Sequence, residues 1–252
     1  MKVALVQFDT RSRAKDKNLQ TIERLLCGVE CDLVVLPEMF ATGYEVNSEE
    51  IAEPHGGPTL RWMQHFAHLQ GFAVAGTIAT RERKEFFNRM YICLPDGSTF
   101  HYDKRHLFTF AGEQEHFVAG RERIIVEWCG VRIAPMICYD LRFPAWSYLP
   151  GKADLRLCSA AWAASRMGAW EALLPARAVE NQAWVVGVNR VGTDPQGTSY
   201  NGHSAAYDYL GNKAATCGQE QGVVVVDINP EKIATFREKF RAWQDADNIE
   251  IR

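Results

Sequence analysis

Short apolar runs rich in β-branched residues alternate along the chain with longer segments whose apolar positions recur every three or four residues. The run 3–8 is followed by a segment in which Leu19, Ile22 and Leu25 share one helical face. Apolar residues at this spacing predict a helix, and the continuous runs predict buried strands. The first part of the chain therefore predicts strands over 3–8, 32–38 and 72–79, and helices over 18–29 and 59–69.

The middle of the chain contains two pairs of apolar runs separated by turn residues. Pro95-Asp96-Gly97-Ser98 separates the runs 89–94 and 99–102, and Cys129-Gly130 separates 124–128 from 131–138. Short Gly- and Pro-containing turns between β-rich runs are typical of hairpins. Antiparallel hairpins beside strand–helix–strand units indicate mixed sheets.

The last third returns to strands and helices. The pattern predicts a helix over 169–183, restarting partway at Pro175, and a final amphipathic helix over 230–243 that Pro230 opens. Further strands are expected over 155–158, 184–189, 204–207 and 223–228. Because no internal repeat, low-complexity segment or polar linker interrupts the pattern, residues 1–252 are expected to form a single domain.

Near-continuous apolar strands need cover on both faces, which helices supply from outside. The pattern favours a four-layer α-β-β-α sandwich, in which two mixed sheets pack face to face with helices outside. A three-layer, doubly wound sheet is the alternative fold.

Composition and charge exclude several classes of partner. The chain is 47% hydrophobic and 23% charged, which is typical of a soluble globular protein. A formal net charge of −3 with scattered Lys and Arg gives no basic patch for nucleic acid or an anionic membrane. We find neither a secretory-signal pattern nor a membrane-spanning apolar run, so we expect a cytoplasmic protein whose seven cysteines stay reduced.

Three chemically distinct side chains follow strand-like runs. Glu38 comes after LVVLP, Lys104 after FHYD and Cys138 after VRIAPMI. Ligand sites of α/β sheets lie just beyond strand ends, so these side chains are candidates for one site. A thiol near pKa 8.5 is mostly protonated at neutral pH, and a carboxylate cannot lower that pKa by its charge. We therefore expect Glu38 to accept the thiol proton during attack and Lys104 to stabilise an oxyanion.

The segments around these residues resemble a known family. LPEMF (36–40), YDKRHLF (102–108) and ICYDLRFP (137–144) are similar to motifs of the nitrilase, or carbon-nitrogen hydrolase, superfamily. VALVQFD near the start, LLPARAVENQAWVVGVNRVG (173–192) and NGHS (201–204) extend the resemblance over essentially the whole chain. The resemblance implies an α-β-β-α sandwich, a homodimer and a Glu-Lys-Cys triad.

The resemblance also implies roles for individual residues. Glu38 is then the base, Lys104 the oxyanion stabiliser and Cys138 the nucleophile, with the backbone amide of Tyr139 as a second oxyanion donor. A second active-site glutamate is expected in GEQEHFVAG (112–120). There Glu113 matches the family spacing to Phe117 and Gly120, whereas Glu115 does not. For Asp140 and Arg142 we expect a structural ion pair or backbone anchors that hold the turn bearing Cys138.

Within the superfamily, the chain most resembles the ω-amidase branch. This implies hydrolysis of the terminal amide of 2-oxoglutaramate or 2-oxosuccinamate through a cysteine thioester, with no cofactor or metal. The expected small-molecule partners are the amide substrate and water. The substrate carboxylate would need an arginine, for which Arg166 is the first candidate and Arg142 the second. Aromatic cavity walls are expected from Phe40, Phe110, Trp162 and Tyr200.

Four other interpretations are less favoured. Related branches act on N-carbamoyl compounds, other small amides or nitriles. A metal hydrolase would have to use His65 and His68, which lack further ligands nearby in sequence. A cysteine–histidine protease would use His106 or His203 as its base, and an inactive nitrilase-like protein would serve as a binding scaffold.

Overall fold

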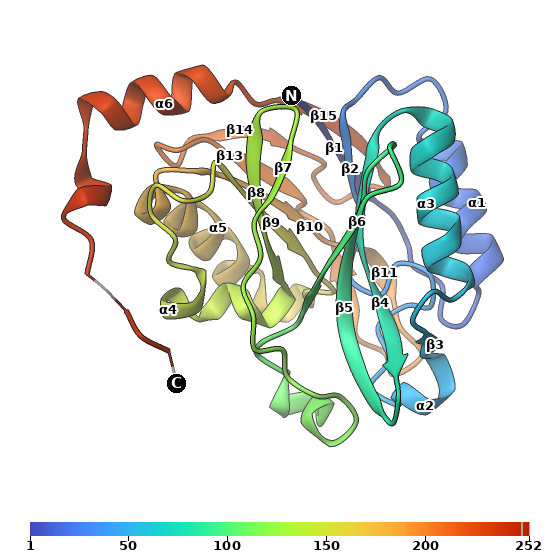
Figure 1. Cartoon of the computed structure of the whole chain (residues 1–252). Coiled ribbons are helices and arrows are strands. Elements are labelled where there is room, and N and C mark those ends of the chain that lie inside the picture. Colours follow the sequence, from blue (N-terminus) through green and yellow to red (C-terminus); the bar gives the residue numbers. More distant parts are fainter. Residues whose placement is uncertain (248, 252) are drawn as a thin grey trace.

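Two β-sheets lie face to face at the centre of the computed structural model, which describes residues 1–247 and 249–251 (Figure 1). The first sheet is seven-stranded. Its strand order is β15 (Gly222–Asp227), β1 (Lys2–Gln7), β2 (Leu33–Val35), β4 (Ala73–Glu82), β5 (Glu85–Cys93) and β6 (Thr99–Asp103), with β3 (Glu53–Pro54) paired to β4.

The second sheet is six-stranded. Its order is β14 (Lys213–Thr216), β13 (Ala205–Tyr207), β10 (Trp184–Val188), β9 (Leu155–Ser159), β8 (Val131–Ile137) and β7 (Val126–Trp128). Both sheets are mixed. Strands β1, β2, β3 and β4 pair in parallel, as do β8, β9 and β10, whereas β15, β5 and β6 in the first sheet and β13, β14 and β7 in the second pair antiparallel. A small hairpin of β11 (Val191–Thr193) and β12 (Ser199–Asn201) lies apart from both.

The main hydrophobic core fills the space between the sheets. Alternate residues of a strand point to opposite faces, so Leu33 and Val35 of β2 point inward with Leu155 and Leu157 of β9. The intervening Val34 joins a second cluster on the outer face of the first sheet. Each central strand is therefore apolar on both faces, which explains its continuous apolar sequence.

Helices cover both outer faces. Helices α1 (Lys15–Leu25) and α3 (Pro58–Gln70) cover the first sheet, and α5 (Met167–Asn181) covers the second (Figure 1). Helix α6 (Pro230–Lys239) inserts Ile233 into the core between the sheets. The predicted α-β-β-α sandwich is confirmed, and the doubly wound alternative is wrong.

Several predicted details differ from the structure. Helix α5 continues through Pro175 without restarting, because Trp170, Leu174 and Ala178 on either side of the proline are buried against the second sheet. This packing compensates for the backbone hydrogen bond that proline removes. Helix α6 ends at Lys239, and a separate 3-10 turn covers Ala242–Gln244. The pattern also missed β3, β11, β12, β14 and the short helices α2 (Ser48–Ile51) and α4 (Pro144–Ser147).

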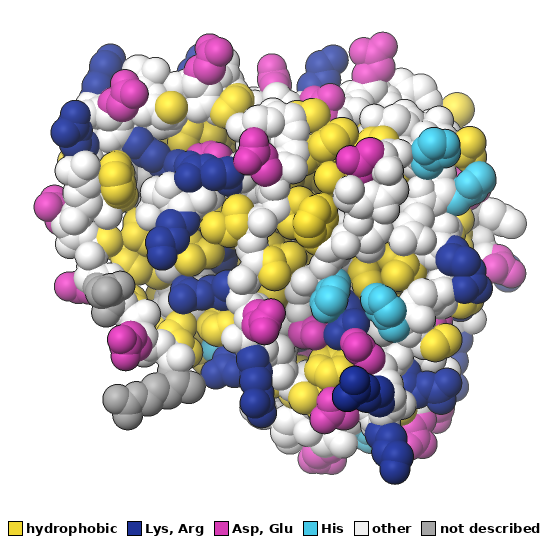
Figure 2. All heavy atoms as spheres, in the orientation of Figure 1, with side chains coloured by type: hydrophobic (Ala, Val, Ile, Leu, Met, Phe, Trp, Pro, Cys, Tyr) yellow, Lys and Arg dark blue, Asp and Glu magenta, His cyan; other side chains and the backbone are white. Residues whose placement is uncertain are grey.

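The surface carries both signs of charge. On the face shown in Figure 2, acidic and basic side chains are interspersed, with hydrophobic atoms between them. Among the described residues, we find no helix whose length and apolarity would let it cross a membrane.

Candidate active site

The three side chains predicted from strand ends meet at one place. Glu38 lies just beyond β2 and Lys104 directly after β6, both in the first sheet, while Cys138 directly follows β8 in the second. The backbone N–H of Glu38 donates to the carbonyl of Ala160, 3.2 Å away, and so joins the two sheets at this point. The site therefore depends on the packing of one sheet on the other.

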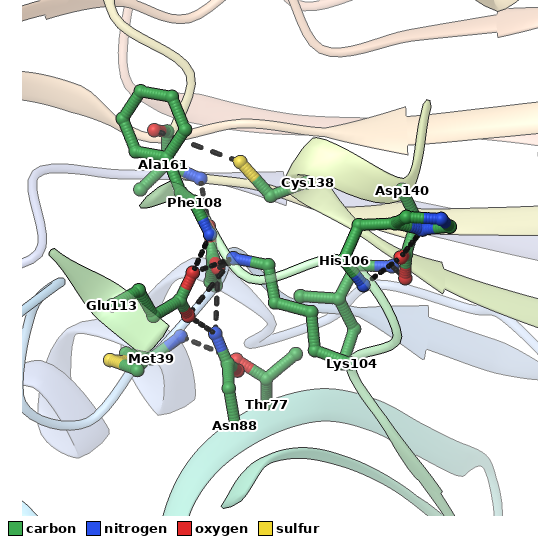
Figure 3. A network of polar contacts seen from close by, with 12 residues as sticks. Met39, Thr77, Asn88, Lys104, His106, Phe108, Glu113, Cys138, Asp140 and Ala161 are labelled. Atoms are coloured by element: carbon green, nitrogen blue, oxygen red, sulfur yellow. Dashed lines mark hydrogen bonds and ion pairs between the residues drawn. The ribbon is translucent and has the colours of Figure 1, made fainter. Parts of the chain in front are cut away.

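Lys104 is at the centre of a buried cluster of charges (Figure 3). Its Nζ lies 2.8 Å from Oε1 of Glu38, and 3.0 and 2.8 Å from the two carboxylate oxygens of Glu113. All three side chains are inaccessible to solvent. A buried charge is tolerated only when it is paired and hydrogen-bonded, and this arrangement meets both requirements.

Further donors fix both carboxylates. Nδ2 of Asn88 donates to Oε1 of Glu38 at 2.8 Å and to Oε1 of Glu113 at 3.0 Å. The backbone N–H of Ala161 donates to Oε2 of Glu38 at 2.9 Å, and that of Phe108 donates to Oε2 of Glu113 at 2.6 Å. These bonds hold the two carboxylates in fixed positions on either side of Lys104.

The structure separates the two glutamates that the sequence offered. Glu113 comes from the short 3-10 helix Glu113–Glu115 and is fully buried against Lys104. Glu115, in contrast, is exposed to solvent, and the carboxylate that bonds Lys104 is that of Glu113. The position of Glu113 is the one expected for a residue that orients Lys104.

Burial and charge shift the pKa of the two reactive groups. Burial alone would lower the pKa of Lys104, but Glu113 and Glu38 outweigh it and raise that pKa well above its ordinary value. Burial, together with the carboxylate of Glu38, raises the pKa of the Cys138 thiol well above its ordinary value, and Lys104 offsets only part of this. The site therefore holds a lysine ammonium and a neutral thiol before substrate binds.

The backbone at Cys138 is in an uncommon conformation. Its φ is 45°, in the left-handed region that residues with a side chain seldom adopt. Strand β8 ends here and the chain turns into the 3-10 helix Cys138–Arg142. The turn projects the thiol, whose Sγ lies 4.0 Å from the carbonyl oxygen of Ala161. The N–H of Tyr139 lies in the first turn of this helix, where backbone donors lack partners within the helix.

Asp140 braces this turn through backbone and side-chain bonds. One carboxylate oxygen accepts from the N–H of Ile137 at 3.0 Å and from the hydroxyl of Tyr102 at 2.7 Å. The other accepts from the backbone N–H of His106 at 2.9 Å and lies 2.8 Å from its ring Nδ1 (Figure 3). Asp140 thus connects the segment that bears Lys104 to the turn that bears Cys138. The backbone-anchor expectation holds for Asp140, whose side-chain contacts are with Tyr102 and His106 and not with Arg142.

The histidines proposed as alternative bases have other partners. The ring of His106 stacks on Phe143 at a centroid distance of 3.9 Å in addition to its contact with Asp140. Nδ1 of His203 lies 3.4 Å from Glu171. In the part of the chain that the structure describes, the cavity beside Cys138 has no histidine in its lining. A cysteine–histidine pair is therefore not formed.

A cavity of about 270 Å³ opens beside Cys138 and Lys104. Five of the residues predicted to contact substrate through their side chains line it, together with Tyr139: Phe110, Arg142, Trp162, Arg166 and Tyr200. The Arg142 guanidinium lies 5.0 Å from the centre of the Trp162 ring. That of Arg166 lies 5.0 Å from the Phe108 ring. Two cations and several aromatic faces therefore surround the space in front of the thiol.

The prediction for Phe40 is wrong. Phe40 is fully buried in the cluster beneath α1 and α3, and its ring lies 6.0 Å from that of Trp62. The preceding Met39 has a φ of 48°, and its N–H is bonded to the hydroxyl of Thr77 at 2.7 Å. This turn directs Phe40 away from the cavity and under the helices.

Sequence reasoning missed several residues of the site. Asn88 could have been identified from the sequence, because it is a polar residue beside an apolar strand-like run and would be costly to bury without partners. Tyr44, which also lines the cavity, lies in an irregular segment with no periodic pattern. Asp194, Gln196 and Thr198 come from the β11–β12 hairpin. Their position depends on a tertiary contact that local sequence does not encode.

No group of three or more His, Cys, Asp and Glu side chains within residues 1–247 and 249–251 is arranged to hold a metal ion. His65 and His68 lie on α3, on the outer face of the first sheet.

Comparison with known proteins agrees with this geometry. The model of the carbon-nitrogen hydrolase family matches residues 2–238. The chain is 40% identical to the omega-amidase YafV of Yersinia enterocolitica, over 99% of this chain and 98% of that protein. It is 33% identical to the 2-oxoglutaramate amidase of Bacillus subtilis, over 96% of each chain.

Solved structures show the same architecture. A carbon-nitrogen hydrolase superfamily protein of Xanthomonas campestris, with an arsenic adduct in its active site, superposes with a TM-score of 0.96 at 38% identity, covering 100% of this chain and 99% of that one. Nit3 of Saccharomyces cerevisiae, a member of the nitrilase superfamily, superposes with a TM-score of 0.84 at 28% identity, covering 95% and 94%. With its family model, full-length relatives and fold in agreement, this chain belongs to the carbon-nitrogen hydrolase family and is an amide-hydrolysing enzyme.

Proposed function

We propose that the protein hydrolyses the terminal amide of small 2-oxo acid amides, such as 2-oxoglutaramate and 2-oxosuccinamate, to the dicarboxylic acid and ammonia. The observation that carries the proposal is the buried Lys104, held 2.8 Å from both Glu38 and Glu113 beside the thiol of Cys138. The names of the full-length relatives, an omega-amidase and a 2-oxoglutaramate amidase, support the choice of amide.

In the first half of the reaction, Sγ of Cys138 attacks the carbonyl carbon of the amide while Glu38 takes the thiol proton. The thiol is neutral at rest, so proton transfer and attack occur together. Lys104 and the N–H of Tyr139 stabilise the oxyanion. The C–N bond then breaks, and the nitrogen leaves as ammonia with the proton that Glu38 held.

In the second half, water takes the place of ammonia and attacks the thioester. Glu38 accepts a proton from this water, the C–S bond breaks, and the proton returns to the sulfur. The products are the carboxylic acid and the free thiol. Glu113 and Asn88 keep Glu38 and Lys104 in place through both halves, because their hydrogen bonds hold the charged atoms in fixed positions.

The substrate carboxylate has two candidate partners, Arg166 and Arg142, whose guanidinium groups lie in the cavity wall. A guanidinium matches a carboxylate through two parallel hydrogen bonds. Phe110 and Trp162, which line the same cavity, supply apolar walls for the carbon chain of a small substrate.

We expect Arg166→Ala to lower kcat/KM for 2-oxoglutaramate by roughly tenfold to a hundredfold, as loss of a charge-assisted hydrogen bond would. Turnover of an uncharged amide of the same length should change far less. Equal losses for both amides would show that Arg166 does not bind the carboxylate.

The experiment that tests the function is a substrate panel scored by kcat/KM for ammonia release. It compares 2-oxoglutaramate and 2-oxosuccinamate with glutamine, an N-carbamoyl amino acid and an aliphatic nitrile. The proposal expects the two 2-oxo acid amides to be the best substrates. A preference for the N-carbamoyl compound or the nitrile would contradict it.

As part of this proposal, the enzyme is a cytoplasmic homodimer. The side chains of Val179, on α5, and Leu210, in the turn after β13, are 53% and 54% exposed. They lie on the same part of the surface, since Gly211 approaches the Val179 side chain. A second copy of the chain would cover these apolar groups. The seven free thiols fit a reducing compartment.

A further inference from the structure

Tyr44 lies at the reacting centre, in the same irregular stretch between β2 and α2 that carries Glu38. Its side chain packs against two hydrophobic clusters, one that includes Met39 and Phe117 and one that includes Ala161 and Tyr200. Nζ of Lys104 lies 5.7 Å from the centre of its ring. The phenol therefore lines the cavity beside the charged cluster.

The hydroxyl of Tyr44 is buried and has no hydrogen-bond partner among the described residues. Neighbouring polar groups in the same cavity wall are satisfied: the hydroxyl of Tyr200 donates to Asp194 at 2.9 Å, and Nε1 of Trp162 donates to the carbonyl of Arg166 at 2.9 Å. A buried hydroxyl without a partner is costly, and such groups are rare outside functional sites. The unpaired hydroxyl of Tyr44 therefore indicates a hydrogen bond to a ligand.

The surrounding charges determine which kind of hydrogen-bonding group the ligand must present to Tyr44. Burial and the charge of Glu113 raise the pKa of the Tyr44 phenol well above its ordinary value, so the group stays neutral. Its oxygen keeps lone pairs that can accept a hydrogen bond. In the proposed reaction the carbonyl oxygen of the amide turns to Lys104 and Tyr139, which leaves the amide nitrogen and its two N–H groups to be held by another part of the cavity.

We propose that the hydroxyl oxygen of Tyr44 accepts a hydrogen bond from the nitrogen of the scissile amide and, after ammonia has left, from the water that replaces it. This inference rests on the amide hydrolysis proposed above and adds a contact outside the Glu-Lys-Cys triad. Both ligands are N–H or O–H donors of similar size, and both must lie beside the carbon that Cys138 attacks. Tyr44 then favours amides that carry an N–H, because an acyl compound without an N–H at this position gains nothing from the contact.

The test compares wild type with Tyr44→Phe, which removes only the hydroxyl. The control is Tyr91→Phe, since Tyr91 is a buried tyrosine outside the cavity whose hydroxyl lies 3.0 Å from Nδ1 of His55. Two quantities are measured on each protein: kcat/KM for ammonia release from 2-oxoglutaramate, and the rate of Cys138 alkylation by N-ethylmaleimide, followed by peptide mass spectrometry. This reagent has no N–H, so its rate reports the shape of the site without the proposed contact.

The inference expects Tyr44→Phe to lower kcat/KM by about tenfold, the effect of one lost hydrogen bond, with an alkylation rate within about twofold of wild type. Tyr91→Phe should leave both quantities near wild type. An unchanged kcat/KM in Tyr44→Phe would overturn the inference, and a parallel fall in both quantities would also do so by showing that the hydroxyl only maintains the shape of the site. If wild type itself released no ammonia from any amide of the panel, that result would contradict the proposed function, on which this inference rests.

Discussion

At the scale of single residues, the environment of Cys138 determines how it can react. Many reactive cysteines have a lowered pKa and are thiolates at rest. Here burial and Glu38 raise the pKa of Cys138, and the ammonium of Lys104 is shared between two carboxylates. The thiol therefore becomes nucleophilic only when a substrate allows Glu38 to take its proton.

This environment predicts an unusual pH dependence of the free enzyme. Because the pKa is raised well above its ordinary value, the Cys138 thiol should stay protonated at neutral and mildly alkaline pH, and the thiolate should appear only at higher pH. Thiolate absorbance near 240 nm, taken as the difference between wild type and Cys138→Ala, measures this directly. A thiolate difference signal that appears as the pH is raised through neutrality would contradict the account.

At the scale of elements, the site depends on how strand ends are connected. Lys104 follows a strand of the first sheet and Cys138 a strand of the second, and Asp140 joins the two through Tyr102 and His106. The contacts made by one carboxylate thus fix the separation of two catalytic groups.

Asp140→Asn tests this connection. An amide cannot accept at both positions, so at least one of the donors from Ile137, Tyr102 and His106 loses its partner in a buried place. We expect a loss of about 1–3 kcal/mol in unfolding free energy and a fall of roughly tenfold in kcat, with a smaller change in KM. Urea unfolding and steady-state kinetics measure these quantities. Asp96→Asn, in an exposed hairpin turn, is the control, and matching behaviour of the two variants would contradict the role of Asp140.

Sequence alone predicted the layers and the triad positions for physical reasons. Buried central strands must be apolar on both faces, so their ends are visible in the pattern, and polar residues at those ends stand out. The path that the chain takes beyond a strand end cannot be predicted from this pattern. The left-handed backbone of Met39 reverses the path of Phe40, and nothing in the residue types around it predicts that turn. Tyr44 was missed for the same reason.

At the scale of the whole molecule, the active site depends on both sheets, and the proposed dimer depends on the surface beside α5. Neither sheet carries a complete set of catalytic groups, so the site exists only when the full sandwich is folded. The exposed Val179 and Leu210 lie on the side covered by α5, away from the helices of the first sheet.

The proposed dimer is tested by placing a charge on this surface. Sedimentation velocity of wild type should give the mass of two chains, whereas Val179→Arg should give mostly single chains, because a charge buried in an apolar interface is costly. Leu69→Arg, on α3 and 61% exposed, is the matched control and should remain dimeric. A monomeric wild type, or a fully dimeric Val179→Arg protein, would contradict the proposed interface.

The central claim is that Cys138 is the nucleophile of an amide hydrolase, and the most direct measurement is ammonia release from 2-oxoglutaramate by Cys138→Ala beside wild type. The control is Cys93→Ala, which removes a buried thiol from the outer face of the first sheet. The account predicts that Cys138→Ala retains less than about one thousandth of wild-type kcat/KM, while Cys93→Ala retains most of it. Substantial ammonia release by folded Cys138→Ala would contradict the account.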